Sequence, residues 1–141
     1  MEKNINQTNL KELFTEPIFK VPRYQRPYSW DEDKVEELWE DIIYAIEQNL
    51  EPDKLPSELN FQNAHFIGMF IFSSVPKSPE NNVIDGQQRL STILILLSLI
   101  RAYLLKLGNN REDCNQLAKT IEEDFLSKTN DEGKRICSRL T

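Results

Sequence analysis

The sequence predicts an α+β fold, in which a small, mainly antiparallel sheet packs with several helices. Two strands are expected first, at 65–73 and at 82–85, because each is a short apolar run bounded by turn residues. Two long segments, 31–49 and 87–107, instead repeat their apolar residues at the helical period. With 141 residues, the chain has the length of one domain with a real core, and we expect a single domain over 1–141.

The strand at 65–73 is apolar on both faces, so we expect it to be central and covered on both sides. It should pair with 82–85 as an antiparallel hairpin. The helix at 87–107 carries apolar residues around most of its surface, which predicts the central helix of the fold, ended by Gly108. Its most apolar part is shorter than a membrane span and contains polar residues, which favours a buried core helix.

Shorter elements complete the prediction. Residues 9–14 and 111–127 are expected to be helical, and 18–21 to form a short strand. Asp31 alone, or Ser29 with Glu32, can cap the helix at 31–49. Four segments read as loops or turns: 23–30, 51–62, 74–81 and 128–134. The last residues, 136–141, resemble the beginning of another element.

The net charge of −6 argues against a protein that simply wraps nucleic acid. The charge is uneven, because residues 31–53 hold ten acidic residues and one lysine, a local net of −9. The remaining residues therefore sum to +3. Acidity belongs to one helix and the loop that follows it, and says little about the rest of the surface.

Two cysteines far apart in a chain without a signal peptide indicate free thiols and a cytoplasmic location. With one histidine and two cysteines, the sequence offers no zinc-type cluster and no HNH-type nuclease centre. We therefore expect no DNA cleavage by this chain itself.

The most informative segment is Asp85–Arg89, where a predicted strand turns into the long helix. A helix N-terminus exposes backbone N–H groups, and Gly86 allows a phosphate to approach them closely. Asp85 and Gln88 have the spacing of a capping box, which is the structural alternative. Arg89 opposes the helix dipole, which favours a bound anion beside it, although a nearby acidic side chain could also pair with it.

A second candidate segment is Arg23-Tyr24-Gln25-Arg26, followed by aromatic residues at 28 and 30. Arginine forks suit phosphate oxygens, and Tyr24 can stack on a base or pack in the core. The alternative is that these arginines pair with acidic residues of the helix at 31–49. We favour ligand contact for Arg26 and packing for Tyr28 and Trp30. His65, taken alone, reads as a hydrogen-bonded residue at a strand start.

Three segments in this order resemble a known family: 21–30 (VPRYQRPYSW), 65–68 (HFIG) and 83–92 (VIDGQQRLST). They resemble the N-terminal domain of GmrS in GmrSD-type restriction systems, which shares a DGQQR motif with other phage-defence proteins. The resemblance covers about residues 7–107 and implies a ParB/sulfiredoxin-like fold. Family members continue into an effector region, so the chain is expected to be the N-terminal part of a longer protein.

The resemblance implies binding and hydrolysis of a nucleoside triphosphate with Mg²⁺, coupled in the whole protein to cleavage of modified DNA. Catalytic roles would fall on Asp85, which would also hold the metal ion, and on Gln87, Gln88 and Arg89. Gly86 would contact the same nucleotide. Residues of the other two segments would also face it: Arg23, Tyr24, Gln25, Arg26 and His65. The implied partners are a C-terminal nuclease domain or a partner subunit, and the chain is also expected to self-associate.

An alternative function remains open. The same arginines could belong to a non-catalytic, ParB-like module that senses DNA, although the net charge of −6 counts against it. A third alternative is a phosphate-site fold that serves to hold a partner subunit. Separate titrations of nucleotide and DNA distinguish the three.

Overall fold

The computed structural model describes residues 6–14, 18–55, 58–60, 65–74, 76–78, 80–129 and 135–136. The chain forms two compact units, of which the second, Pro27–Met69, is inserted into the first. The first unit consists of the segments Met1–Arg26 and Phe70–Thr141. Of the element expected at 136–141, only Ile136 is described, and residues 137–141, which include Cys137, lie outside the described residues.

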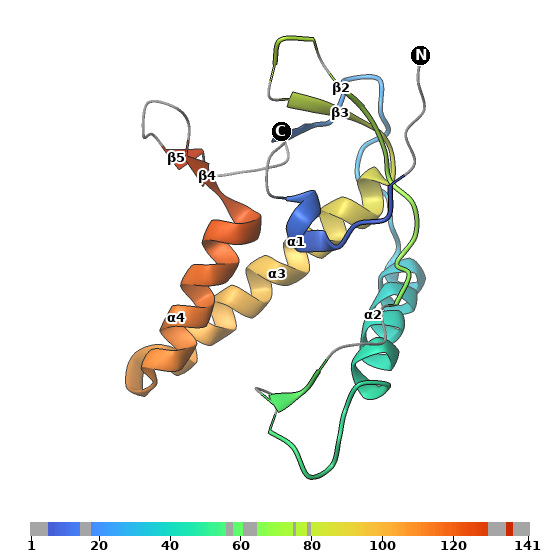
Figure 1. Cartoon of the computed structure of the whole chain (residues 1–141). Helices are drawn as coiled ribbons and strands as arrows, with labels where there is room; N and C mark the ends of the chain where they lie inside the picture. Colours follow the sequence, from blue (N-terminus) through green and yellow to red (C-terminus); the bar gives the residue numbers. More distant parts are fainter. Residues whose placement is uncertain are drawn as a thin grey trace. The chain divides into compact units, whose positions relative to one another are not determined.

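A three-stranded sheet lies at one end of the first unit (Figure 1). Its strands are β1 (Ile18–Lys20), β2 (Ile71–Ser74) and β3 (Glu80–Asp85), in the order β1-β3-β2. β2 and β3 are antiparallel, which confirms the predicted hairpin, whereas β1 runs parallel to β3. The sheet is therefore mixed rather than mainly antiparallel, and β3 is its central strand.

The prediction of a central strand at 65–73 is wrong. The described residues 65–70 are not in a strand, and β2 begins at Ile71 on the edge of the sheet. Gly68 has a φ of 109°, a left-handed conformation that interrupts extended backbone. The register also shifts between Ile71 and Phe72. A run of apolar residues indicates that a segment is hydrophobic, but it does not indicate which strand pairs with neighbours on both sides.

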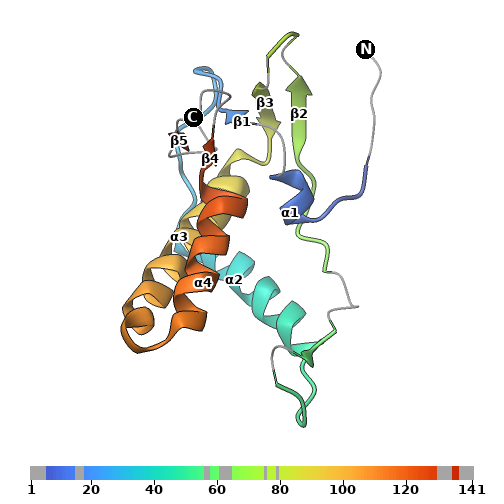
Figure 2. The same cartoon turned by 60° about the vertical axis from the view of Figure 1, so that its left-hand side comes forward.

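The helix α3 (Gln87–Leu107) follows β3, with the predicted bounds, and α4 (Glu112–Ile121) returns alongside it (Figures 1 and 2). The 3-10 turn η2 (Gly108–Asn110) joins the two helices. α4 ends in a π-helical turn, η3 (Glu122–Leu126), and a short pair of strands follows, β4 (Lys128–Thr129) with β5 (Arg135–Ile136). The fold class is thus α+β, as predicted, and the ParB/sulfiredoxin-like assignment stays a prediction.

The core of the first unit lies where the sheet meets the beginning of α3. Four side chains are buried there from four elements or their ends: Phe14, Phe19, Val83 and Leu90. Phe14 follows α1 (Leu10–Leu13), and its ring meets the Phe19 ring edge-on, with centroids 5.4 Å apart. The helix α3 is therefore packed on the sheet through its first turns, as predicted.

Farther along, α3 is not enclosed as a central helix would be. Its apolar side chains at 95, 99, 100 and 103 are all exposed, with Leu99 at 63%. The helical segment Gln87–Asn110 is long and apolar enough to cross a membrane by length and composition. Core helices of proteins outside membranes meet the same criterion. Self-association through such a surface stays a prediction.

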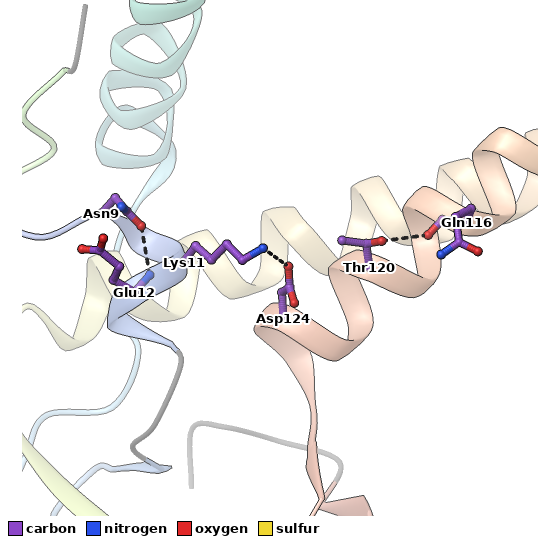
Figure 3. Close-up of polar contacts among 6 residues, drawn as sticks. All are labelled: Asn9, Lys11, Glu12, Gln116, Thr120 and Asp124. Carbon is purple, nitrogen blue, oxygen red and sulfur yellow. Dashed lines mark hydrogen bonds and ion pairs between the residues drawn. The ribbon is translucent and has the colours of Figure 1, made fainter. Parts of the chain in front are cut away.

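The short helix α1 is attached to the end of α4 (Figure 3). Asn9 caps α1, since its side-chain oxygen accepts a hydrogen bond from the Glu12 N–H at 2.9 Å. The Lys11 ammonium lies 3.1 Å from the Asp124 carboxylate of η3, and the Phe14 and Phe125 rings meet edge-on. A hydrogen bond from Thr8 lowers the pKa of Glu12. The two ends of the first unit are thus tied by a charge pair and an aromatic contact.

The second unit contains α2 (Glu32–Glu47), where a helix was predicted at 31–49. The Asp31 carboxylate accepts a hydrogen bond from the Lys34 N–H at 3.1 Å, so Asp31 alone is the cap. Leu38 is buried within α2. The described residues between α2 and His65 include a loop, as the prolines predict.

Gly108 ends α3, as predicted. Gly108 is the C-cap residue, and its φ of −67° is right-handed rather than the left-handed conformation that glycine often adopts at helix ends. A Cβ at this position would lie 1.9 Å from Asn115 Oδ1, and the Asn115 amide donates to the Gly108 carbonyl at 3.0 Å. A side chain at position 108 would therefore have to displace the Asn115 side chain.

We expect Gly108→Ala to destabilise the chain by about 1 kcal/mol. The alanine gains up to about 1 kcal/mol in helix propensity but displaces Asn115, at a cost of about 1–3 kcal/mol with the lost hydrogen bond. Urea denaturation measures the difference. The control is the same change in an Asn115→Ala background, where it should be neutral or stabilising. A destabilisation of equal size in both backgrounds would contradict this explanation.

Candidate functional site

The turn between β3 and α3 contains the predicted segment Asp85–Arg89. Gly86 has a φ of 88°, which disfavours any residue with a side chain, and it occupies the N-cap position of α3. Asp85 lies one residue earlier, and its Oδ1 accepts a hydrogen bond from the Gly86 N–H at 2.8 Å. The capping box of Asp85 with Gln88 is therefore wrong. Because glycine has no side chain, the N-cap residue offers no acceptor of its own to the first N–H groups of the helix.

The loop after β1 is hydrogen-bonded to this turn through two glutamine side chains. The Gln25 amide donates to the Ile84 carbonyl at 3.0 Å and, less closely, to the Val83 carbonyl at 3.4 Å. The Gln87 amide donates in the opposite direction, to the Arg26 carbonyl at 3.1 Å. The structure thus brings together two of the three predicted segments, although they lie about sixty residues apart in the sequence.

Arg89 lies in the first turn of α3 and is partly buried. Its guanidinium carbon is 6.0 Å from the centroid of the Phe70 ring, and that ring stacks on Phe72. A guanidinium that lies over an aromatic face keeps its positive charge, and its N–H groups can still donate hydrogen bonds to other groups. The aromatic platform at Phe70 was not predicted as part of the site, because its apolar strand pattern reads as core.

Three arginines of these two segments, Arg23, Arg26 and Arg89, have no acidic partner in the described part of the first unit. Arg23 and Arg26 are exposed, as is Tyr24, at 76%. A surface with unpaired guanidinium groups beside a helix N-terminus is suited to an anionic ligand.

His65 belongs to the second unit, where its surroundings are local. Its Nε2 lies 3.8 Å from Asp41 Oδ1 of α2, and its ring meets the Tyr44 ring edge-on, with centroids 6.2 Å apart. The side chain is partly exposed. Its expected role at the nucleotide stays a prediction.

Asp85 is the carboxylate of the turn that could hold a metal ion. Its Oδ1 is engaged by the Gly86 N–H, and the side chain is exposed. Within the described part of the chain, histidine, cysteine and acidic side chains form no group of three or more that could enclose a metal ion. One carboxylate together with ligand phosphates is the arrangement that Mg²⁺ commonly uses, so Asp85 fits that ion better than a protein-enclosed metal.

Comparison with protein families identifies the chain. The family described as the GmrSD restriction endonuclease, N-terminal domain, matches residues 10–140. The chain belongs to this family. The match extends beyond the three resembling motifs to include α4, η3 and the β4–β5 pair. No curated protein matches the sequence.

Membership of the GmrSD N-terminal domain family assigns the chain to restriction and phage defence. It also implies a restriction protein with a nuclease domain that acts on DNA. The suspected resemblance is thus confirmed at the level of the family. The DGQQR segment of this GmrSD domain is the strand–turn–helix at 85–89, which the loop at 21–26 adjoins.

Proposed function

We propose that this GmrSD domain binds a nucleoside triphosphate at the β3–α3 turn and hydrolyses it as part of a restriction protein. One observation carries the proposal: hydrogen bonds from Gln25 and Gln87 join the arginine-bearing loop to the glycine turn. The backbone at Arg26 is therefore held at the helix turn that carries Arg89, so that two distant segments each bring one arginine residue to it. A polyphosphate has the charge and the size to use both segments at once.

The arginines supply charge neutralisation in this proposal. Arg89, held beside Phe70, and Arg26, on the hydrogen-bonded loop, would each donate to phosphate oxygens. Arg23 adds a further exposed cation, and the exposed Tyr24 ring offers a face on which a base can stack. Fixed positive groups that meet the developing charge are the main requirement of phosphoryl transfer.

The turn itself would approach the phosphates through its backbone. Gly86 has no Cβ to keep a phosphate away, and the N–H groups at the start of α3 provide the positive end of the helix dipole. Gln88 lies in the same turn as Arg89 and is proposed to orient the attacking water. Asp85 would hold Mg²⁺, which supplies charge neutralisation when it is bound.

In the whole protein, we propose that hydrolysis controls cleavage of modified foreign DNA by a C-terminal nuclease domain or a partner subunit. The proposal includes the ParB/sulfiredoxin-like relationship, with the β1-β3-β2 sheet and the start of α3 as the shared core. Its support is the family membership together with the arrangement of the turn.

Calorimetric titration of ATP and GTP into the purified chain, with and without Mg²⁺, tests the proposal. We expect saturable binding of at least one nucleotide, tighter with Mg²⁺ because the ion adds a link between Asp85 and the phosphates. Modified and unmodified DNA duplexes are titrated separately. Binding of DNA without binding of either nucleotide would favour the DNA-sensing alternative over the proposal. The affinity for DNA should then fall steeply as the salt concentration rises.

A further inference from the structure

We propose that Gln25 and Gln87 are positioning residues that hold Arg26 and Arg89 at a fixed spacing and do not themselves contact the nucleotide. The inference rests on the proposed function, and it assigns a new role to two glutamines of the motif segments. It follows from what their side-chain amides already bind.

The two hydrogen bonds are reciprocal. Gln25 belongs to the loop and donates to backbone carbonyls at the end of β3, at Ile84 and Val83. Gln87 belongs to α3 and donates back to the backbone of the loop, at the Arg26 carbonyl. Each segment thus contributes one side-chain donor and receives one on its backbone. We call this pair the glutamine latch.

Gln25 and Gln87 are partly buried residues, although their two shorter hydrogen bonds are exposed, and every acceptor of the glutamine latch is a backbone carbonyl. A carbonyl accepts hydrogen bonds and never donates them, so the partner side chain must supply an N–H. A glutamine amide does this without charge, whereas a glutamate of the same length cannot. The loop is itself ordered at this point, because the Gln25 N–H donates to the Pro22 carbonyl at 2.9 Å.

The latch determines where the two arginines can lie. Gln87 holds the Arg26 backbone from the first turn of α3, the same turn that carries Arg89 two residues later. Among the described residues, no other hydrogen bond or ion pair joins Arg26 to this turn. Contacts with phosphate depend on geometry, and a displacement of about 1 Å can cost roughly a hundredfold in function.

A double-mutant cycle on ATP and GTP affinity tests the role, with Gln87→Met and Arg26→Ala in the full chain. Methionine keeps the length of the side chain and lacks the donor. Gln87→Met alone should weaken binding about threefold to tenfold, the equivalent of one hydrogen bond. In the Arg26→Ala background, the same change should alter affinity by less than about twofold, because the residue that it positions is gone.

Hydrogen exchange without ligand provides a second measurement that does not require nucleotide. Gln87→Met should accelerate amide exchange in residues 22–26 and leave α4 unchanged. Gln116→Met, an exposed glutamine of α4, is the matched control and should change neither exchange nor affinity.

Each outcome decides a different point. An effect of Gln87→Met that is equally large with and without Arg26 would show that Gln87 does not act through Arg26, and it would overturn the inference. Unchanged exchange in 22–26 would overturn the latch itself. If the wild-type chain binds neither nucleotide, the proposed function fails and the positioning role fails with it, whereas faster exchange would still establish the latch as a structural link.

Discussion

Replacing Arg89 with alanine is expected to weaken nucleotide binding about tenfold to a hundredfold and to leave the stability of the fold nearly unchanged. A charge-assisted hydrogen bond to a phosphate contributes about 1.5–3 kcal/mol, which corresponds to this loss of affinity. Titration calorimetry with ATP or GTP measures the change.

The stability is expected to stay level because two small terms oppose each other. Removing a cation from the first turn of α3 relieves an unfavourable dipole interaction of about 0.3–1 kcal/mol. Losing the contact with Phe70, whose ring centroid lies 6.0 Å from the guanidinium carbon, costs about 0.5–1 kcal/mol. A structural arginine would behave differently, since its removal lowers the melting temperature without affecting ligand affinity.

Arg111→Ala is the matched control for this experiment. Arg111 lies at the start of α4, is exposed, and pairs with Asp113. An exposed pair of this kind contributes little to stability, and it lies away from the turn, so nucleotide affinity should stay at the wild-type value. Equal affinity of wild type and Arg89→Ala, with a lowered melting temperature for the latter, would mean that the site is misplaced.

Phe19→Ala is expected to reduce the free energy of unfolding by about 3–5 kcal/mol. Phe19 is fully buried at the centre of β1, between the rings of Phe14 and Phe72. Its removal leaves a cavity and breaks both aromatic contacts, each of which adds about 0.5–1.5 kcal/mol to simple burial. Since a domain of this kind has a total stability of about 5–15 kcal/mol, the variant should be only marginally folded.

Urea denaturation followed by circular dichroism measures the loss. Phe66→Ala removes the same side chain from a position that is 76% exposed, and its effect should stay within about 0.5 kcal/mol. A Phe19→Ala variant as stable as Phe66→Ala would contradict the position of β1 in the sheet, because β1 reaches the core through this residue.

Elements specified by neighbouring residues could be predicted closely. α3 begins at Gln87 and ends at Leu107, as predicted, because strong helix formers fill the segment between two glycines. The hairpin of β2 with β3 could also be predicted, since a short turn joins its strands. The parallel pairing of β1 with β3 could not, because periodicity gives no information about pairing between distant segments.

The same distinction applies to the candidate site. The anion-binding character of the turn at Gly86 is local, so the sequence predicts it from a glycine and a helix start. The hydrogen bond from Gln25 to the Ile84 carbonyl joins residues far apart in the chain, and a backbone acceptor leaves no mark on the sequence. The contact between Arg89 and the Phe70 ring could not be predicted either, because Phe70 lies in an apolar run and reads as a core residue.

The connections of the inserted unit have a consequence for the turn. The chain leaves the first unit after Arg26, whose carbonyl is bound by Gln87, and returns at Phe70, whose ring lies beside Arg89. Both covalent connections of Pro27–Met69 therefore join residues that contact the same helical turn. Covalent bonds transmit a displacement without any packing between the units. We therefore expect a change in the separation of Arg26 and Phe70 to alter the contacts of Gln87 and Arg89 in the first turn of α3.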